Sequence, residues 1–369
     1  MEEAEGTHQV RTLFYPSHLL HWRSLIPVAC ELVSRGHAIT VQTTHAEWRG
    51  MPTFQMHWTP TRVTGVNKTS LAWLAGRMGY QQEWVKAQGC IEYRRHLAPK
   101  EDECVVSTTK DMDFLKLFKQ EFPEKNAMAI GYQHVPVCLS MGRLAERRRY
   151  PDEMSPPFLI GHPFERLHRF AEVYAGNTAY PCGFPHLDKV QISHSTKQNA
   201  VLIQHPGGHR GISGHGWLVE TGRVLASAGY RMFICPHFLP GFGYGADAIG
   251  RALVRASIPS WQIVKHWWDV AGQCDLILTT GSSAAYEMWA VGLTNIFILG
   301  YLGGTRHEKF QMFSDLLVES PEALGKLLRG LPGSAQATEA LTREVMEAYR
   351  SVHNGRGAKT AADVIEGKV

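Results

Sequence analysis

The chain lacks long apolar runs. No segment reaches the roughly 18 uncharged apolar residues that a membrane-spanning helix needs, and the first residues, MEEAEGTHQV, are acidic and polar, unlike a secretory signal. Paired cysteines are lacking too, because the seven cysteines include no CxxC spacing. This excludes a cysteine-rich zinc site and argues against a disulfide framework. We therefore expect a cytoplasmic protein with reduced cysteines and no transmembrane segment.

Charge is also scarce, at 20% of residues, while 44% are apolar, as in ordinary globular proteins. A chain of 369 residues is long enough for two domains. The net charge of +4 is unevenly spread: residues 11–100 hold eleven Lys or Arg against four acids, and residues 101–124 hold seven acids. A basic N-terminal face would favour an anionic partner; ordinary clustering on a solvated surface is the alternative.

Short apolar runs alternate with helical patterns, which predicts two α/β domains, each a doubly wound parallel sheet. The helix predicted between the first two strands, SLIPVACELVSRG, ends at Gly36. A Gly- and Pro-rich stretch at 174–188 is the predicted linker, so we divide the chain into domains 1–185 and 186–369. Strands are predicted at 10–15, 37–44, 53–58, 104–109, 127–133, 200–206, 231–237, 274–280 and 295–300.

The turn after the strand 274–280 has the sequence TTGSSAAYE. Gly281 permits close approach to the backbone, and Ser282 and Ser283 can either cap the following helix or bind an anion at its N-terminus. Glu287 lies one turn into that helix among apolar residues. A carboxylate there needs a partner, either the hydroxyls of a nucleotide ribose or a nearby Arg.

The segment GSSAAYEMWAVGLTNIFIL resembles the donor-binding segment of GT-B glycosyltransferases, which have two Rossmann-like domains facing a central cleft. The resemblance implies that Glu287 binds the donor ribose and that Ser282 and Ser283, with Gly281 and Thr280 beside them, approach the diphosphate. Thr294 departs from the family, which usually has Pro after Gly-Leu. The donor implied is a nucleotide-sugar co-substrate, most commonly a UDP-sugar, with no other cofactor.

The segment HWRSLIPVACELVSRGHAITV resembles the first helix of the same superfamily. In that superfamily a His on the loop after the first strand stands fifteen residues before the Gly of RGH, as His21 does before Gly36. The resemblance implies that His21 is the general base that deprotonates the acceptor. Histidine side chains in general suit this role because they exchange protons near neutral pH. His18 competes for it, and Ser24 replaces the family's Pro.

Two further loops follow strands of the second half. QHPGGHRGISGHGW is rich in glycine and holds Arg210, which could pair with a diphosphate. The next loop begins with His237. His205, His209 and His215 match no standard zinc spacing, so we expect no metal. These loops also resemble UDP-N-acetylglucosamine 2-epimerases through His209-Arg210, His237 and the Thr305-Arg306-x-Glu308 segment, and the serine pair resembles CDP-glycerol glycerophosphotransferases.

Three hypotheses follow. The first is a metal-independent glycosyltransferase of GT-B architecture whose acceptor is unassigned; an anionic polymer such as DNA with a hydroxylated base is one candidate, given the basic bias and the tryptophans of residues 11–100. Buried tryptophans and a solvated basic helix are the simpler interpretation of that region. The second is a 2-epimerase or a glycerophosphotransferase-like enzyme. The third is a polymer-binding module without catalysis.

Overall fold

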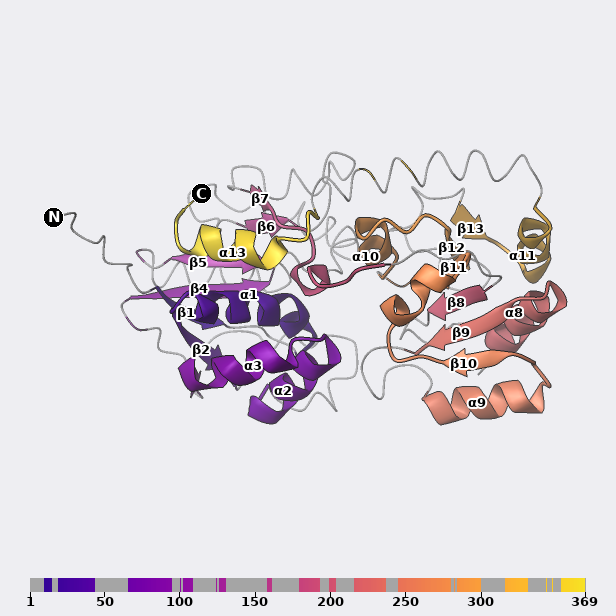
Figure 1. Ribbon diagram of the computed structural model, residues 1–369, viewed down its shortest axis with the longest axis horizontal. Helices are drawn as coiled ribbons and strands as arrows, with labels where there is room; N and C mark the ends of the chain where they lie inside the picture. Colours follow the sequence, from indigo (N-terminus) through magenta and orange to yellow (C-terminus); the bar gives the residue numbers. More distant parts are fainter. Residues whose placement is uncertain are drawn as a thin grey trace, which may run out of the picture. The chain divides into compact units, whose positions relative to one another are not determined.

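The computed structural model divides into two compact units (Figure 1). The first unit comprises Met1–Lys189 with Val352–Val369, and the second comprises Val190–Ser351. The residues that the structure describes are 10–14, 19–43, 66–94, 100, 102–108, 124, 126–130, 158–160, 179–192, 199–203, 216–236, 245–279, 282, 284–299, 316–330, 343, 347 and 353–368.

The first unit is built on a parallel sheet of seven strands in the order β3-β2-β1-β4-β5-β6-β7. The chain moves outward from β1 to one edge and then returns to build the other half from β4, so the sheet is doubly wound. Its strands are β1 (Arg11–Phe14), β2 (Ala38–Gln42), β3 (Ile91–Arg94), β4 (Glu103–Thr108), β5 (Ala127–Ile130), β6 (Phe158–Ile160) and β7 (Ala179–Pro181).

The predicted strands 10–15, 37–44, 104–109 and 127–133 are confirmed, with bounds that differ by one to three residues at an end. The prediction at 53–58 lies outside the described residues. The segment 174–188, predicted as a linker, contains β7 and the 3₁₀ helix η6 (Pro185–Leu187). Its described part, 179–188, is packed into the first unit because Cys182, Phe184 and Leu187 supply buried apolar side chains that the Gly and Pro content concealed.

Helix α1 (Trp22–Ser34) follows β1 and is the centre of the helical layer in the first unit. It contacts α13 (Gly357–Ile365), η6, α3 (Gln81–Ala87) and α2 (Lys68–Arg77). The predicted end of the helix at Gly36 is confirmed, since Gly36 has φ +89° and its N–H donates to the carbonyl of Val33 at 2.9 Å. This left-handed residue turns the chain directly into β2.

The helix α13 packs against α1 although more than 300 residues separate them in the chain. The Asp188 carboxylate caps α13, accepting from the N–H groups of Gly357 at 3.0 Å and Ala358 at 2.8 Å. Burial raises the pKa of Asp188 to about 6, against these two bonds, which lower it. A Cβ at Gly357 would lie 2.3 Å from the carbonyl oxygen of Cys182, so only glycine fits. The sequence analysis placed these last residues with the second half; their contacts lie in the first unit.

The second unit is built on a parallel sheet of six strands in the order β10-β9-β8-β11-β12-β13, again doubly wound. Its strands are β8 (Asn199–Ile203), β9 (Arg231–Cys235), β10 (Trp261–Ile263), β11 (Leu276–Thr279), β12 (Ile296–Leu299) and β13 (Leu317–Val318). Its helices are α8 (Gly216–Ser227), α9 (Ala246–Arg255), α10 (Ala284–Ala290) and α11 (Pro321–Leu328). The four strands predicted between 200 and 300 are confirmed.

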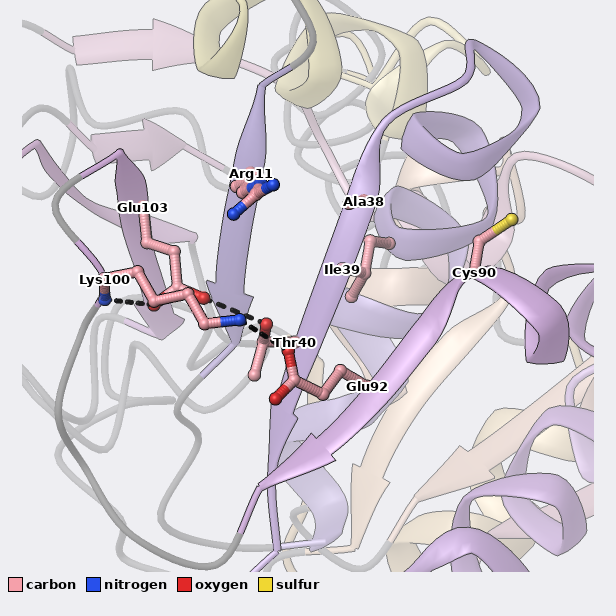
Figure 2. Close-up of a pocket in the computed structure, with 8 residues that line it drawn as sticks. All are labelled: Arg11, Ala38, Ile39, Thr40, Cys90, Glu92, Lys100 and Glu103. Carbon is pink, nitrogen blue, oxygen red and sulfur yellow. Dashed lines mark hydrogen bonds and ion pairs between the residues drawn. The ribbon is translucent and has the colours of Figure 1, made fainter.

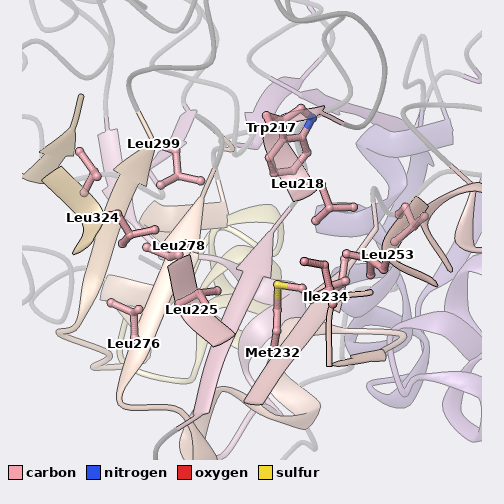
Figure 3. Packing of buried hydrophobic residues seen from close by; sticks show 13 residues of the cluster. Trp217, Leu218, Leu225, Met232, Ile234, Leu253, Leu276, Leu278, Leu299 and Leu324 are labelled. Atoms are coloured by element: carbon pink, nitrogen blue, oxygen red, sulfur yellow. The ribbon is translucent and has the colours of Figure 1, made fainter. Parts of the chain in front are cut away.

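One apolar cluster joins α8, α9 and α11 to the strands of the second sheet (Figure 3). Trp217 and Leu225 of α8 pack over Met232 and Ile234 of β9, and Leu253 of α9 closes one side. The β-branched and leucine side chains of the strands alternate toward this layer, as the pleat requires. The cluster holds the strands in register, and so fixes where the loops at their carboxyl ends begin.

Candidate active site

The candidate residues of the first unit follow β1, which lies at the switch point of its sheet because β1 has both β2 and β4 as neighbours. In open parallel sheets, ligands bind at the carboxyl ends of strands at such a point. The chain leaves β1 at Phe14, forms the 3₁₀ helix η1 (Leu19–His21) and enters α1 at Trp22. His21 occupies the N-cap position of α1 with only 2% of its surface exposed.

Aromatic rings surround the start of α1. The Trp22 ring lies 5.7 Å from the Phe14 ring and packs edge-on against Trp84 of α3 at 6.4 Å. All three side chains are fully buried. The backbone at His21 is therefore held by a rigid apolar base, which is what a positioned proton acceptor requires.

Arg23 is a candidate that the sequence reasoning missed. It lies in the first turn of α1 and only 6% of it is exposed. A cation at a helix N-terminus faces the positive end of the helix dipole, so a buried one there is unfavourable unless an anionic group compensates it. That conflict between residue type and helix position, visible in HWRSLIP, was the signal in the sequence.

The candidate residues of the second unit follow β11, which pairs with both β8 and β12 and so lies at the switch point of the second sheet. The Ser282 N–H donates to the Thr279 hydroxyl at 3.0 Å, and the Ala284 N–H donates to the Ser282 hydroxyl at 3.3 Å. The Ser282 hydroxyl thus holds the first N–H of α10, and its two predicted roles, capping and anion binding, both stay predictions. The hydroxyl of Thr279, which is fully buried, fixes the turn.

Glu287 lies in the first turn of α10 with 1% of its surface exposed. The residues around it in the helix, Ala285, Met288 and Trp289, are buried as well. Burial raises the pKa of the neighbouring Tyr286 phenol above its ordinary value. A carboxylate in such surroundings is held by hydrogen bonds or charge, so α10 presents one strong acceptor within a dry layer.

A second unanticipated feature follows β10 at the same edge of the second sheet. The His266 ring stacks on the Trp268 ring with centroids 4.3 Å apart and planes 11° apart, and Trp267 packs edge-on against Trp268 at 5.4 Å. The backbone N–H of His266 donates to the Asp269 carboxylate at 3.3 Å, which fixes the turn. The Trp268 ring is half-buried, whereas the His266 and Trp267 rings are buried. A half-buried aromatic ring can stack on a nucleobase. The run KHWWD (265–269) carried the signal in the sequence, although the strand before it, β10, was not predicted.

The remaining candidates lie outside the described residues. They are His18, Arg210, His237, Gly281 and Ser283, with the secondary candidates His205, His209, Thr280, Arg306 and Glu308. Their roles therefore stay predictions. Within the described part of the chain, no three or more His, Cys, Asp or Glu side chains are grouped so as to hold a metal ion, and no helix is long and apolar enough to cross a membrane.

A cavity of about 240 Å³ lies at the opposite edge of the first sheet, where the strands begin (Figure 2). Glu103 lines this cavity and has several hydrogen-bond donors around it. Its carboxylate accepts from the Thr40 hydroxyl at 3.0 Å, from the backbone N–H of Lys100 at 2.7 Å and from the guanidinium of Arg94 at 2.9 and 3.0 Å. The bonds to Glu103 raise the pKa of Arg94 above its ordinary value. Because these groups satisfy one another, we assign the network to the stability of β2, β3 and β4.

The basic bias of residues 11–100 is reduced by such pairs. Arg11 pairs with Asp102 at 3.2 Å, Lys100 with Glu92 at 3.1 Å, and Arg35 with Glu31, Asp363 and Glu366. Trp22 and Trp84 are core residues, as the simpler interpretation expected. Trp73 of α2 is 37% exposed, with the Arg77 guanidinium 5.8 Å from its ring.

No protein-family model matches this chain, and no curated protein matches it in sequence. Solved structures match it along almost the whole length. CalG4, the calicheamicin glycosyltransferase, is 15% identical with a TM-score of 0.58, covering 98% of each chain. UGT71G1 of Medicago truncatula, complexed with UDP-glucose, is 11% identical with a TM-score of 0.58, covering 99% of each chain.

The UDP-GlcNAc 2-epimerase of Neisseria meningitidis, bound to UDP-GlcNAc, is 11% identical with a TM-score of 0.51, covering 97% of this chain and 99% of the epimerase. At these identities the likeness concerns the fold. The predicted α/β architecture of GT-B type is confirmed, and the same fold serves both transferases and an epimerase.

Proposed function

We propose, from the premise that this chain has the GT-B fold, that it transfers a sugar from a nucleotide-diphosphate donor to an acceptor hydroxyl. The observation that carries the proposal is the position of the two candidate groups: His21 follows the switch-point strand of the first sheet, and the Ser282–Glu287 turn follows that of the second. Ligands of doubly wound sheets bind at these points. The donor we expect is a UDP-sugar, as in the complexes of similar fold.

In the proposed reaction, a ring nitrogen of His21 removes the proton of the acceptor hydroxyl as the oxygen attacks the anomeric carbon. The bond from that carbon to the diphosphate breaks, and the nucleoside diphosphate leaves with the electron pair. Glu287 accepts hydrogen bonds from the donor ribose, and the turn at Ser282 and Ser283 approaches the diphosphate. Neutralisation by N–H groups and Arg210 would make a metal ion unnecessary.

Donor binding tests the assignment of Glu287. We expect Glu287→Ala to weaken UDP binding by at least tenfold, because a charge-assisted hydrogen bond contributes about 1.5–3 kcal/mol. Titration calorimetry with UDP, GDP, CDP, CMP and ADP measures the affinity and identifies the base. Glu322→Ala, at an exposed position of α11 in the same unit, is the matched control. An unchanged affinity for the preferred nucleotide in Glu287→Ala would remove Glu287 from the site.

The epimerase is the second candidate, because one solved structure of this fold is a UDP-GlcNAc 2-epimerase. Incubation with UDP-sugars and no acceptor separates the two functions, since only an epimerase interconverts free nucleotide-sugars. Addition of EDTA to the working assay tests metal independence; loss of activity would contradict it.

For the acceptor, we propose an anionic polymer such as DNA carrying a hydroxylated base. The support is the exposed Trp73 beside Arg77 on α2, since an exposed ring next to a cation suits contact with bases and phosphates. Binding to single- and double-stranded oligonucleotides, measured against salt, tests this. Affinity that does not fall with rising salt, or that Trp73→Ala leaves unchanged, would overturn it. Salt-dependent binding unchanged in His21→Ala, with no donor turnover, would instead favour a non-catalytic binding module.

A further inference from the structure

The strand β10 forms one edge of the second sheet, and its outer side is open among the described residues. The Met232 N–H of β9 donates to the Ser260 carbonyl at 2.9 Å, and the Val264 N–H donates to the Ile234 carbonyl at 2.9 Å. Since backbone groups alternate along a strand, those of Trp261 and Ile263 point away from β9. Open N–H and C=O groups on an edge strand are a template for another strand.

The helix α9 runs beside this edge (Figure 1) and forms one wall of a groove of about 570 Å³. The groove is lined by Gly250 and Val254 of α9 and by Trp261 and Ile263 of β10. Val254 is 67% exposed, and only Ile249 and Leu253 of the helix are buried. An apolar strip beside an open strand edge is a surface that a partner covers.

The charges on α9 identify the kind of partner. Asp247 lies in the first turn and Arg255 in the last, and both line the groove. Both are exposed, and neither forms an ion pair with any described residue. A second α9 placed antiparallel to the first would bring Asp247 of each copy opposite Arg255 of the other. Arg251, which also lines the groove and is exposed, lies midway between them and would face its own copy. Two attractive pairs then act against one repulsive pair, so the surface is complementary to itself, as a two-fold interface requires.

We propose that β10 and α9 form a two-fold interface between two copies of this chain. The β10 strands pair antiparallel about Gln262, so that Trp261 of each copy lies opposite Ile263 of the other. Each of these pairs exchanges two backbone hydrogen bonds, and the two sheets become one continuous sheet. The α9 helices then lie side by side on one face, with Val254 in the shared apolar strip. The interface uses none of the candidate active-site residues.

Sedimentation velocity of the full chain over a concentration series tests the proposal. We expect the wild type to be a dimer, and Val254→Lys and Ile263→Pro to be monomers, because one places a charge in the apolar strip and the other removes an outward N–H group. Val85→Lys is the matched control: Val85 is 63% exposed on α3 of the first unit, so this variant should stay dimeric. Far-UV circular dichroism checks that each variant is folded.

A charge exchange tests the antiparallel arrangement. Arg255→Asp should raise the dimer dissociation constant about tenfold, because it sets acid against acid at both ends of the helix pair. Adding Asp247→Arg to the same chain should restore the wild-type constant. A monomeric wild type, or a dimer that persists in both Val254→Lys and Ile263→Pro, would overturn the proposed interface. Failure of the second exchange to restore the constant would overturn the helix pairing.

Discussion

Helices α1 and α9 are both parts of a doubly wound unit, yet they are covered very differently. Ten of the thirteen residues of α1 are buried, including Arg23 and Ser24, because α2, α3, α13 and η6 all contact it. Of the ten residues of α9, only Ile249 and Leu253 are buried. The chain uses its own distant segments to enclose the helix that begins at His21, and it leaves α9 available for a partner.

The comparison shows what enclosure provides. A fully surrounded helix fixes the position of the residue at its start, and fixed geometry is what proton transfer needs. An amphipathic helix with a bare face retains freedom to bind another surface. Three experiments sharpen this contrast. They change the residue at the start of α1, the buried and exposed valines of α1 and α9, and the ion pairs at the end of α1.

The largest effect is expected at the start of α1. Under the proposed function, His21→Ala should lower turnover by about 10² or more, equal to about 2.7 kcal/mol in the activation barrier, because the general base is lost. Donor affinity should stay unchanged. Single-turnover kinetics and calorimetry with UDP measure the two quantities. If His18→Ala has this effect and His21→Ala does not, the base lies on the preceding loop.

The same substitution on both helices measures the difference in cover. Val28 of α1 is fully buried, whereas Val254 of α9 is 67% exposed. Val28→Ala should reduce the free energy of unfolding by about 2 kcal/mol, through lost burial and the cavity left behind. Val254→Ala should change it by less than about 0.5 kcal/mol. Urea denaturation at dilutions where the chain is monomeric gives both values; equal losses would contradict the contrast.

The smallest effect concerns the charged clasp at the end of α1, which is formed by Glu366, Arg35, His37 and Lys368. Glu366, which follows α13, bonds to Arg35, His37 and Lys368. Burial alone would raise the pKa of Glu366, but the bonds from Lys368, His37 and Arg35 outweigh it and lower the pKa to about 2. The folded value lies below the ordinary value of 4.5, so this contribution is present above about pH 4.5 and is lost as the pH falls toward 2.

We therefore expect Glu366→Gln to flatten the pH dependence of the unfolding free energy between about pH 4.5 and 2. Urea denaturation of wild type and variant at intervals across that range measures it. Glu220→Gln, at an exposed position of α8 paired with Arg223, serves as the control. Parallel curves for the wild type and Glu366→Gln would show that the clasp does not stabilise α13 against α1.

Much of the fold could be predicted because its signals are local. Short apolar runs mark the strands 11–14 and 276–279, and the glycine at 36 marks a helix end. Each signal reflects the preferences of a few neighbouring residues. The candidates His21 and Glu287 came from the resemblance of short segments to GT-B glycosyltransferases, and their roles stay predictions. The sequence would also have singled out Arg23, because a basic residue in the first turn of a helix faces the positive end of the helix dipole.

Other features depend on which distant segments meet, and local patterns do not encode that. A helical pattern announces that a face of α13 is buried, but the partner of that face, α1, is chosen by packing, and Arg35 meets Asp363 across 328 residues. The Gly- and Pro-rich residues 179–187 form ordered structure because η6 packs against α1 and α13, and β7 pairs with β6. The bare side of α9 likewise follows from β10 lying at the edge of its sheet. Burial is a property of the assembled chain, since it depends on every segment that excludes water from a site.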